Sequence, residues 1–262
     1  MGNGQNAPHE KILELIQVKL DEIELRENVC ILHAIESGSR AWGFASPDSD
    51  YDVRFIYMRS VEEYLKLEKT RDVIEWQLDE ILDINGWDLQ KALRLLRSSN
   101  PTLFEWSRSP IVYKTTEAWT NLSRNFDDFF LRRVGLHHYL SAARGNYQKY
   151  LLGEVVSLKK YFYVLRPLLA CKWILDRGCP PPMLFSELVE TELEPSLRSF
   201  IDDLLQAKAV TSEVGLAKRN DTLNSYIEET LADLMESVNA LPLDHKVDWG
   251  QLNGLFLSTI GF

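Results

Sequence analysis

The sequence predicts an α+β protein in which a small mixed β-sheet with flanking helices is followed by an all-helical region. Short runs rich in β-branched and aromatic residues, typical of strands, occur in the first 112 residues. Beyond residue 115 the apolar residues recur at helical spacing. No apolar stretch approaches the roughly 18 residues of a membrane-spanning helix, which excludes a membrane span. We therefore expect one domain over 1–112 and a helical domain over 113–262.

The elements of the first domain follow from periodicity and turn residues. Apolar residues at helical spacing predict a helix over 9–26, and a helix beginning after Asp88 is expected to end before Asn100-Pro101. A short helix is expected at 61–65. Apolar β-branched runs bounded by turn residues predict strands at 29–35, 51–57, 73–78 and 81–84.

In the second domain the pattern changes to the helical period. The spacing predicts helices near 116–125, 127–151, 155–177, 195–208 and 220–238. Three consecutive prolines from Pro180 end the third of these helices.

Charge and cysteine content limit the class of protein. The net charge of −10 argues against a general nucleic-acid coat protein. Residues 132–177, however, contain nine Lys or Arg and only two acids, which indicates either an anion site or basic residues that cover helix surfaces. The odd number of cysteines, three, without a C-x-x-C pair predicts reduced, buried thiols. With no secretory signal visible, we expect a cytoplasmic protein.

The residues that indicate chemistry are concentrated between Gly38 and Asp52. Gly38-Ser39 follows a predicted strand and opens a turn or helix, where glycine lets the backbone approach a phosphate closely. Ten residues after Ser39 the chain enters the next predicted strand at Asp50-Tyr51-Asp52. Residues two apart in a strand share a face, so Asp50 and Asp52 are expected to point together. Paired carboxylates of this kind suit Mg²⁺ bridged to nucleotide phosphates.

These residues resemble a known signature. Gly38 to Gly43, read with Ser49 to Arg54, is similar to the motif of polymerase-β-type nucleotidyltransferases. The runs Leu82 to Leu89, Ser99-Asn100-Pro101 and Lys159 to Pro167 resemble, more narrowly, the predicted nucleotidyltransferases associated with RNA repair. The finer resemblance runs from about Val29 to Arg177. It implies a nucleotidyltransferase domain in the first half of the chain.

The resemblance also implies roles for individual residues. Asp50 and Asp52 would hold Mg²⁺ or Mn²⁺, while Gly38 and Ser39 would grip the triphosphate. A third carboxylate on a later strand is expected to bind one metal ion and help deprotonate the acceptor. The candidates are Asp79, Asp83 and Asp88. We favour Asp83 because it lies in a strand-like run, whereas Asp88 is typical of a helix N-cap; Asp88 as the ligand remains the alternative.

Basic residues are the further candidates for nucleotide binding. Arg40, beside the Gly-Ser turn, would contact the triphosphate or form a surface ion pair with Asp48. On the helix predicted over 155–177, Lys159, Tyr163 and Arg166 would share a face, with Lys160 beside them. A triphosphate near a base or ribose suits this set. The alternative is that Tyr163 packs in the core while the cations extend into water.

Other conspicuous side chains are expected to be structural. Trp42 and Trp87 flank turns, where aromatic residues more often pack in a core than stack on a base. His33 lies in an apolar strand and is expected to be a core histidine. The His137-His138 pair lacks further ligands at useful spacing, so a zinc site is not expected.

Two functions fit the sequence. The first is a nucleotidyltransferase that moves an NMP group from an NTP, with ATP as the expected donor, to a hydroxyl and releases pyrophosphate. An RNA end, a protein hydroxyl and a small molecule all fit as acceptor, and the RNA link comes from the resemblance alone. The second is a non-catalytic nucleotide-sensing or antitoxin-like protein. The retention of both Asp50 and Asp52 favours the enzyme. The sequence leaves the oligomeric state open.

Overall fold

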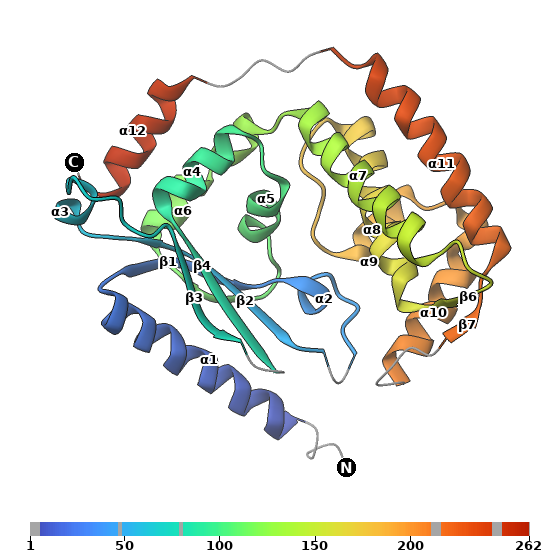
Figure 1. Ribbon diagram of the computed structural model, residues 1–262, viewed down its shortest axis with the longest axis horizontal. Helices are drawn as coiled ribbons and strands as arrows, with labels where there is room; N and C mark the ends of the chain where they lie inside the picture. The colour runs from blue at the N-terminus through green and yellow to red at the C-terminus, as the bar shows by residue number, and fades with distance from the viewer. Residues whose placement is uncertain (1–5, 47–48, 79–80, 211–215, 243–247, 262) are drawn as a thin grey trace.

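A five-stranded mixed sheet and a helical half make up the molecule (Figure 1). The structure, a computed structural model, describes residues 6–46, 49–78, 81–210, 216–242 and 248–261. The sheet has the order β3-β4-β2-β1-β5, in which β2 and β4 are parallel and all other neighbours are antiparallel. The mixed sheet followed by helices confirms the predicted fold class. The strands are β1 (Cys30–Glu36), β2 (Tyr51–Met58), β3 (Val73–Leu78), β4 (Leu82–Asp88) and β5 (Val112–Thr115).

Helices cover both faces of this sheet (Figure 1). On one face, α1 (Asn6–Glu27) buries Ile16, Leu20 and Ile23 against strand residues, because these side chains recur at helical spacing. On the other face a second core contains residues of a 3₁₀ helix (Phe126 and Phe129) and of four α-helices, the last of which comes from the end of the chain. These four helices are α4 (Leu89–Arg97), α5 (Pro101–Ser107), α6 (Glu117–Ser123) and α12 (Trp249–Thr259).

The helical half has its own core around α8, whose middle section is almost entirely buried. The strands β6 (Val155–Ser157) and β7 (Leu216–Lys218) form a separate antiparallel pair. Within the described residues, no helix combines the length and apolar character needed to cross a membrane. The helices of this half are α7 (Arg132–Tyr150), α8 (Lys159–Arg177), α9 (Phe185–Glu192), α10 (Arg198–Val210) and α11 (Asp221–Ala240).

The predicted domain boundary lies at the start of β5. This strand pairs with β1 and so extends the sheet beyond residue 112, and α12 packs against α4 and α6 although it is the last helix of the chain. The division into 1–112 and 113–262 stays a prediction. The connection between the halves is also made by Phe44, which follows the short helix α2 (Gly38–Ala41) and stacks on Phe162 of α8 at a ring distance of 4.9 Å.

Several local predictions were wrong. Residues 155–157 form β6 instead of the first turn of α8, and the helix predicted over 127–151 is divided into the 3₁₀ helix η1 (Phe126–Phe129) and α7. Asn100-Pro101 ends α4 but also begins α5, because Asn100 caps the N–H of Thr102. The sequence analysis did not predict α5, β5, α9, β7 or α12. Of the three free thiols, Cys171 is buried as predicted but Cys30 is exposed.

Candidate active site

The Gly38-Ser39 turn lies directly against the carboxylate of Asp52. Gly38 has φ = +61°, a left-handed conformation that glycine adopts without steric cost. A Cβ atom at this position would lie 2.1 Å from Oδ2 of Asp52. The N–H of Ser37 donates to the carbonyl of Asp52 at 2.8 Å, which ties the turn to β2. The predicted turn-helix at Gly38 is therefore confirmed, and only glycine fits there.

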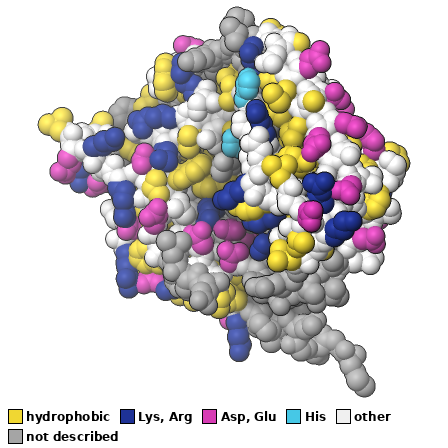
Figure 2. Space-filling model, turned by 45° about the vertical axis from the view of Figure 1, so that its right-hand side comes forward, with side chains coloured by type: hydrophobic (Ala, Val, Ile, Leu, Met, Phe, Trp, Pro, Cys, Tyr) yellow, Lys and Arg dark blue, Asp and Glu magenta, His cyan; other side chains and the backbone are white. Residues whose placement is uncertain are grey.

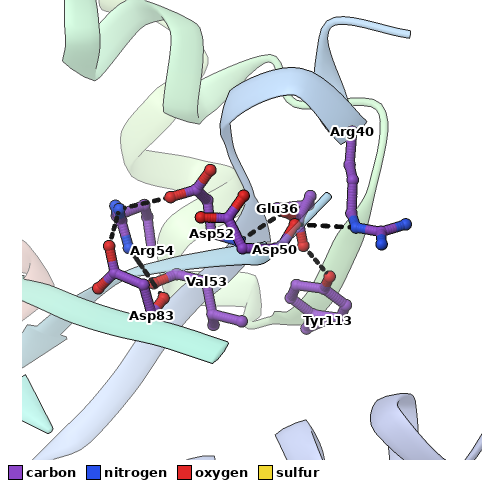
Figure 3. Close-up of polar contacts among 8 residues, drawn as sticks. All are labelled: Glu36, Arg40, Asp50, Asp52, Val53, Arg54, Asp83 and Tyr113. Carbon is purple, nitrogen blue, oxygen red and sulfur yellow. Dashed lines mark hydrogen bonds and ion pairs between the residues drawn. The ribbon is translucent and has the colours of Figure 1, made fainter. Parts of the chain in front are cut away.

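The register of the sheet brings two of the predicted carboxylates together. Asp52 of β2 pairs with Asp83 of the parallel strand β4, and Asp50 lies two residues before Asp52 at the strand entrance. The side chains of Asp52 and Asp83 are 23% and 28% exposed. Burial raises the pKa of Asp52, Arg54 lowers it, and the charges of Asp50 and Asp83 raise it. Figure 3 shows the three carboxylates on neighbouring strands.

Arg54 lies between two of these carboxylates. Its Nη2 donates to Oδ1 of Asp52 at 2.9 Å and to Oδ2 of Asp83 at 2.7 Å (Figure 3). Its Nη1 donates to the main-chain carbonyls of Asp83 and Val53. Arg54 was not among the residues singled out from the sequence. It follows Asp52 by two residues, and side chains two apart in a strand share a face, so this spacing was the signal that could have identified it.

Glu36 is a second residue that the sequence analysis missed. Its side chain is fully buried, and burial raises its pKa to about 7. The N–H of Asp52 donates to Oε1 of Glu36 at 2.7 Å, and the hydroxyl of Tyr113 donates to Oε2 (Figure 3). An acidic residue that ends an apolar strand immediately before Ser37-Gly38 was the available signal. Glu36 fixes the backbone of Asp52 from behind.

The donor set suits a hard divalent cation, which prefers carboxylate oxygens. Asp52 uses one oxygen on Arg54 while its Oδ2 faces Gly38, and Asp83 likewise has only Oδ2 on Arg54. In the described part of the chain, no three His, Cys, Asp or Glu side chains meet the geometric requirement for a metal centre. Asp50, Asp52 and Asp83 offer the type of ligand that Mg²⁺ or Mn²⁺ prefers, but in this arrangement the Arg54 guanidinium lies between Asp52 and Asp83.

The other candidates for the third carboxylate lie elsewhere. Asp88 is at the opposite end of β4 from Asp83, where it caps α4 by accepting from the N–H of Gln90 at 2.8 Å. It also accepts from the Tyr64 hydroxyl at 3.1 Å. The predicted N-cap role of Asp88 is confirmed. Asp79 lies outside the described residues.

Two residues of the Gly-Ser segment contact the loop before β2. Arg40 donates from Nε to the carbonyl of Asp50 at 2.9 Å and from Nη2 to that of Ser49, and its guanidinium lies 3.8 Å from the centre of the Tyr51 ring. Ser39 donates to the Ser49 hydroxyl at 3.2 Å. Arg40 therefore clamps the backbone that carries Asp50. The alternative ion-pair partner, Asp48, lies outside the described residues.

The α8 residues divide into two groups. Tyr163 faces the carboxylates: burial raises its pKa, and the charges of Asp50 and Asp52 raise it further. Lys160 lies over the ring of Tyr163, with Nζ 4.9 Å from its centre, and Lys159 is exposed at the start of the helix. Tyr163 also packs edge-on against Trp42, which follows the Gly-Ser segment.

Arg166, by contrast, is only 4% exposed. It forms an ion pair with Glu105 of α5 at 2.9 Å, donates to the carbonyl of Met183, and lies 4.6 Å from the centre of a Trp42 ring. Arg166 and Tyr163 both contact Trp42 and so share a face of α8 as expected, but packing of α8 against α5 and the Met183 segment encloses the Arg166 guanidinium that was expected to bind a nucleotide. Arg166 links the two halves of the molecule.

The residues expected to be structural are so. Trp42 packs partly buried against the helical core, and Trp87 stacks on Trp106 at a ring distance of 3.9 Å. His33 stacks on Trp119, and burial lowers its pKa to about 4.

Acidic side chains gather near the centre of the face in Figure 2, with Lys and Arg side chains on either side.

Comparison with known proteins identifies the family of this chain. The model of the RNA repair pathway DNA polymerase beta family matches residues 12–258. The uncharacterized protein YcgL of Bacillus subtilis (strain 168) is 45% identical over 246 residues, which cover 92% of this chain and 94% of that protein. A crystal structure of a nucleotidyltransferase-like protein from Exiguobacterium sibiricum 255-15 has a TM-score of 0.32 and 15% identity, covering 87% of this chain and 75% of that chain. The chain belongs to the RNA repair pathway DNA polymerase beta family.

Proposed function

We propose that the protein is a metal-dependent nucleotidyltransferase that transfers an NMP group from an NTP, with ATP as the expected donor, to a hydroxyl acceptor. The observation that carries this proposal is the contact between Gly38 and Asp52, where a Cβ would lie 2.1 Å from the carboxylate oxygen. A backbone free of a side chain thus adjoins a carboxylate, so a phosphate held at the turn would also reach a cation held by Asp52.

Each wall of the site has a role in this proposal. Gly38 and Ser39 would bind the triphosphate through the backbone and a hydroxyl. Asp50, Asp52 and Asp83 would hold Mg²⁺ or Mn²⁺, which when bound neutralises phosphate charge at the attacked phosphorus and the leaving group. Glu36 and Arg40 position the backbone of Asp52 and Asp50 through the contacts described above.

The α8 wall would bind the rest of the nucleotide. Tyr163 is near Asp50 and Asp52, whose charges raise its pKa, and its ring packs edge-on against Trp42, which follows α2. Lys160 and Lys159 would supply mobile positive charge to the phosphates, and Tyr163 a surface for the base or ribose. Arg166 is excluded from direct contact in this proposal because protein partners surround its guanidinium.

The reaction is an in-line displacement. The acceptor hydroxyl oxygen forms a bond to the α-phosphorus, and the bond from that phosphorus to the pyrophosphate oxygen breaks. The hydroxyl proton passes to Oδ1 of Asp83, whose Oδ2 accepts from Arg54. We propose an RNA end as the acceptor, on the description of the family alone.

The test offers each α-labelled NTP, with Mg²⁺ or Mn²⁺, to separate pools of RNA, protein and metabolites. The expected result is that the wild-type protein produces a labelled acceptor and the Asp52→Asn protein does not. Label in protein or metabolites instead of RNA would contradict RNA as the acceptor but would still support nucleotidyl transfer. No labelled product in any pool, with either metal ion and all four NTPs, would contradict the proposal.

A further inference from the structure

Arg54 has more contacts with the carboxylate site than any role in nucleotide binding requires. It is on β2 two residues beyond Asp52, and its side chain is 17% exposed. It donates to both carboxylates that face each other across β2 and β4, at 2.9 and 2.7 Å (Figure 3). We infer that Arg54 is a built-in counter-cation of the carboxylate site, which keeps Asp52 and Asp83 together and lowers the affinity of the site for divalent cations.

Electrostatics supports the first half of this inference. Adjacent parallel strands place Asp52 and Asp83 side by side, and Asp50 adds a third negative charge nearby. Carboxylates at this separation repel one another unless a cation lies between them. A guanidinium cannot release its proton in a protein, so Arg54 supplies a permanent positive charge at that point.

The individual contacts leave one oxygen of each carboxylate without a bond to Arg54. Arg54 holds Asp83 twice, through Oδ2 and through the main-chain carbonyl at 2.9 Å, but holds Asp52 only through Oδ1. Oδ2 of Asp52 faces the Gly38 turn. A divalent cation can therefore bind on the turn side of the carboxylates, opposite the guanidinium, where it meets repulsion from Arg54.

Two effects of Arg54 oppose each other, and their relative size decides the prediction. The clamp on Asp83 favours metal binding by fixing a ligand, whereas the positive charge disfavours it. Asp83 is already fixed by its place in a central strand, with β2 and β3 paired on its two sides. The charge, in contrast, acts at contact distance from both ligands. We therefore expect the charge to dominate.

The inference rests on the proposed function, and its test measures metal binding without any reaction. Mn²⁺ binding to the full chain is measured by calorimetry and by the loss of the free-ion electron spin resonance signal, without nucleotide. Thermal unfolding is followed with and without Mn²⁺. The variants are Arg54→Met, which removes the charge, Arg54→Gln, which keeps a hydrogen-bond donor without the charge, and Arg54→Lys, which keeps the charge.

The expected result is Mn²⁺ affinity at least about tenfold higher in Arg54→Met and Arg54→Gln than in the wild type. Both variants should melt at a lower temperature without Mn²⁺ and gain more from adding it, since the ion then replaces the lost counter-charge. Arg54→Lys should stay near the wild type. The matched control is Arg71→Met, which removes an arginine paired with Glu27 away from this site and should leave Mn²⁺ affinity unchanged.

The outcomes separate this inference from the proposed function. Mn²⁺ binding by the wild type that depends on Asp52, with equal or weaker binding by Arg54→Met and Arg54→Gln, would contradict the role of Arg54 as a counter-cation. It would leave the proposed enzymatic function unaffected. Absence of Mn²⁺ binding from the wild type and from all charge-removing variants would overturn both. Mn²⁺ binding that emerges only when the charge is removed would support the inference in its strongest form.

Discussion

The two walls of the candidate site differ in how the sequence encodes them. On the sheet wall, Asp52 and Asp83 occupy paired positions on parallel strands, and Asp50 directly precedes β2. On the α8 wall, Tyr163 is near Asp50 and Asp52 but Arg166, three residues beyond Tyr163, is buried. Alternation along a strand depends on the backbone alone, whereas the accessibility of a helix face depends on what packs against it.

Each wall also contains a buried ionisable group, and the two are stabilised differently. Arg166 faces an opposite charge on Glu105. Glu36 accepts hydrogen bonds from a main-chain N–H and a tyrosine hydroxyl, with no cation in direct contact among the hydrogen bonds of the described residues. Removing one partner of a buried ion pair leaves the other charge uncompensated, whereas a carboxyl stabilised by neutral donors is open to protonation. The walls should therefore respond differently to substitution and to pH.

The largest expected effect is on the sheet wall. Asp52→Asn should lower the rate of nucleotidyl transfer on the order of a thousandfold, because it removes a carboxylate that would hold the metal ion. The free energy of unfolding should change little, since the loss of one charge relieves repulsion among carboxylates. Initial rates with labelled NTP and urea unfolding measure the two quantities. Asp128→Asn, at an exposed position in η1, is the matched control. Undiminished transfer by Asp52→Asn would show that the carboxylates of the sheet wall take no part in the reaction.

Asp83 and Asp88 test the same wall from its two ends. Asp83→Asn should reduce transfer as strongly as Asp52→Asn, whereas Asp88→Asn should retain it because asparagine also caps helices. Asp88→Ala should retain transfer but lower the free energy of unfolding by about 0.5–2 kcal/mol through loss of the cap. An inactive Asp88→Asn beside an active Asp83→Asn would reverse the assignment of the third carboxylate.

On the α8 wall, Arg166→Met should act on stability. Removing one partner of a buried ion pair leaves Glu105 uncompensated and should cost about 3–5 kcal/mol of unfolding free energy. Urea unfolding measures this cost, and the double variant with Glu105→Gln should recover part of it. A fully stable Arg166→Met protein that has lost NTP binding would show that Arg166 belongs to the nucleotide site.

Lys160→Ala should have the opposite effect. Its side chain lies over the rings of Tyr150 and Tyr163 and forms no ion pair with any residue that the structure describes, so the free energy of unfolding should change little. The affinity for Mg–NTP should fall by roughly 1–3 kcal/mol, more at low salt, through loss of a charge-assisted contact. Calorimetric titration at two salt concentrations measures it. Lys172→Ala, further along the same helix, is the control; equal losses in both variants would show a general charge effect.

A further expected effect concerns the dependence of stability on pH. Because the pKa of Glu36 is raised to about 7 in the folded protein, the folded state binds a proton that the unfolded state releases above its ordinary carboxyl pKa of 4.5. The contribution of Glu36 to stability is therefore fully present below pH 4.5 and is lost as the pH rises through about 7, by up to about 3 kcal/mol. Glu36→Gln should remove this component.

The measurement for Glu36 is the difference between the wild-type and Glu36→Gln unfolding free energies from pH 4 to 8. The difference is needed because His33, with its pKa lowered to about 4, adds a component of opposite sign that rises with pH up to about 6.5. A difference curve that does not change with pH would show that Glu36 titrates as an ordinary carboxyl.

The sequence by itself determined the mixed sheet followed by helices and the Gly38 turn, because strand alternation and glycine conformation are local properties of the chain. The shared face of Asp50 and Asp52 stays a prediction. The sequence also favoured Asp83 over Asp88 through the capping pattern of α4. Only the tertiary structure decided what depends on contacts between distant segments. The β2–β4 register brought Arg54 between Asp52 and Asp83, β5 placed Tyr113 on Glu36, and the packing of α5 enclosed Arg166. Periodicity gives the face of an element, but burial of that face is set by partners that lie far away in the sequence.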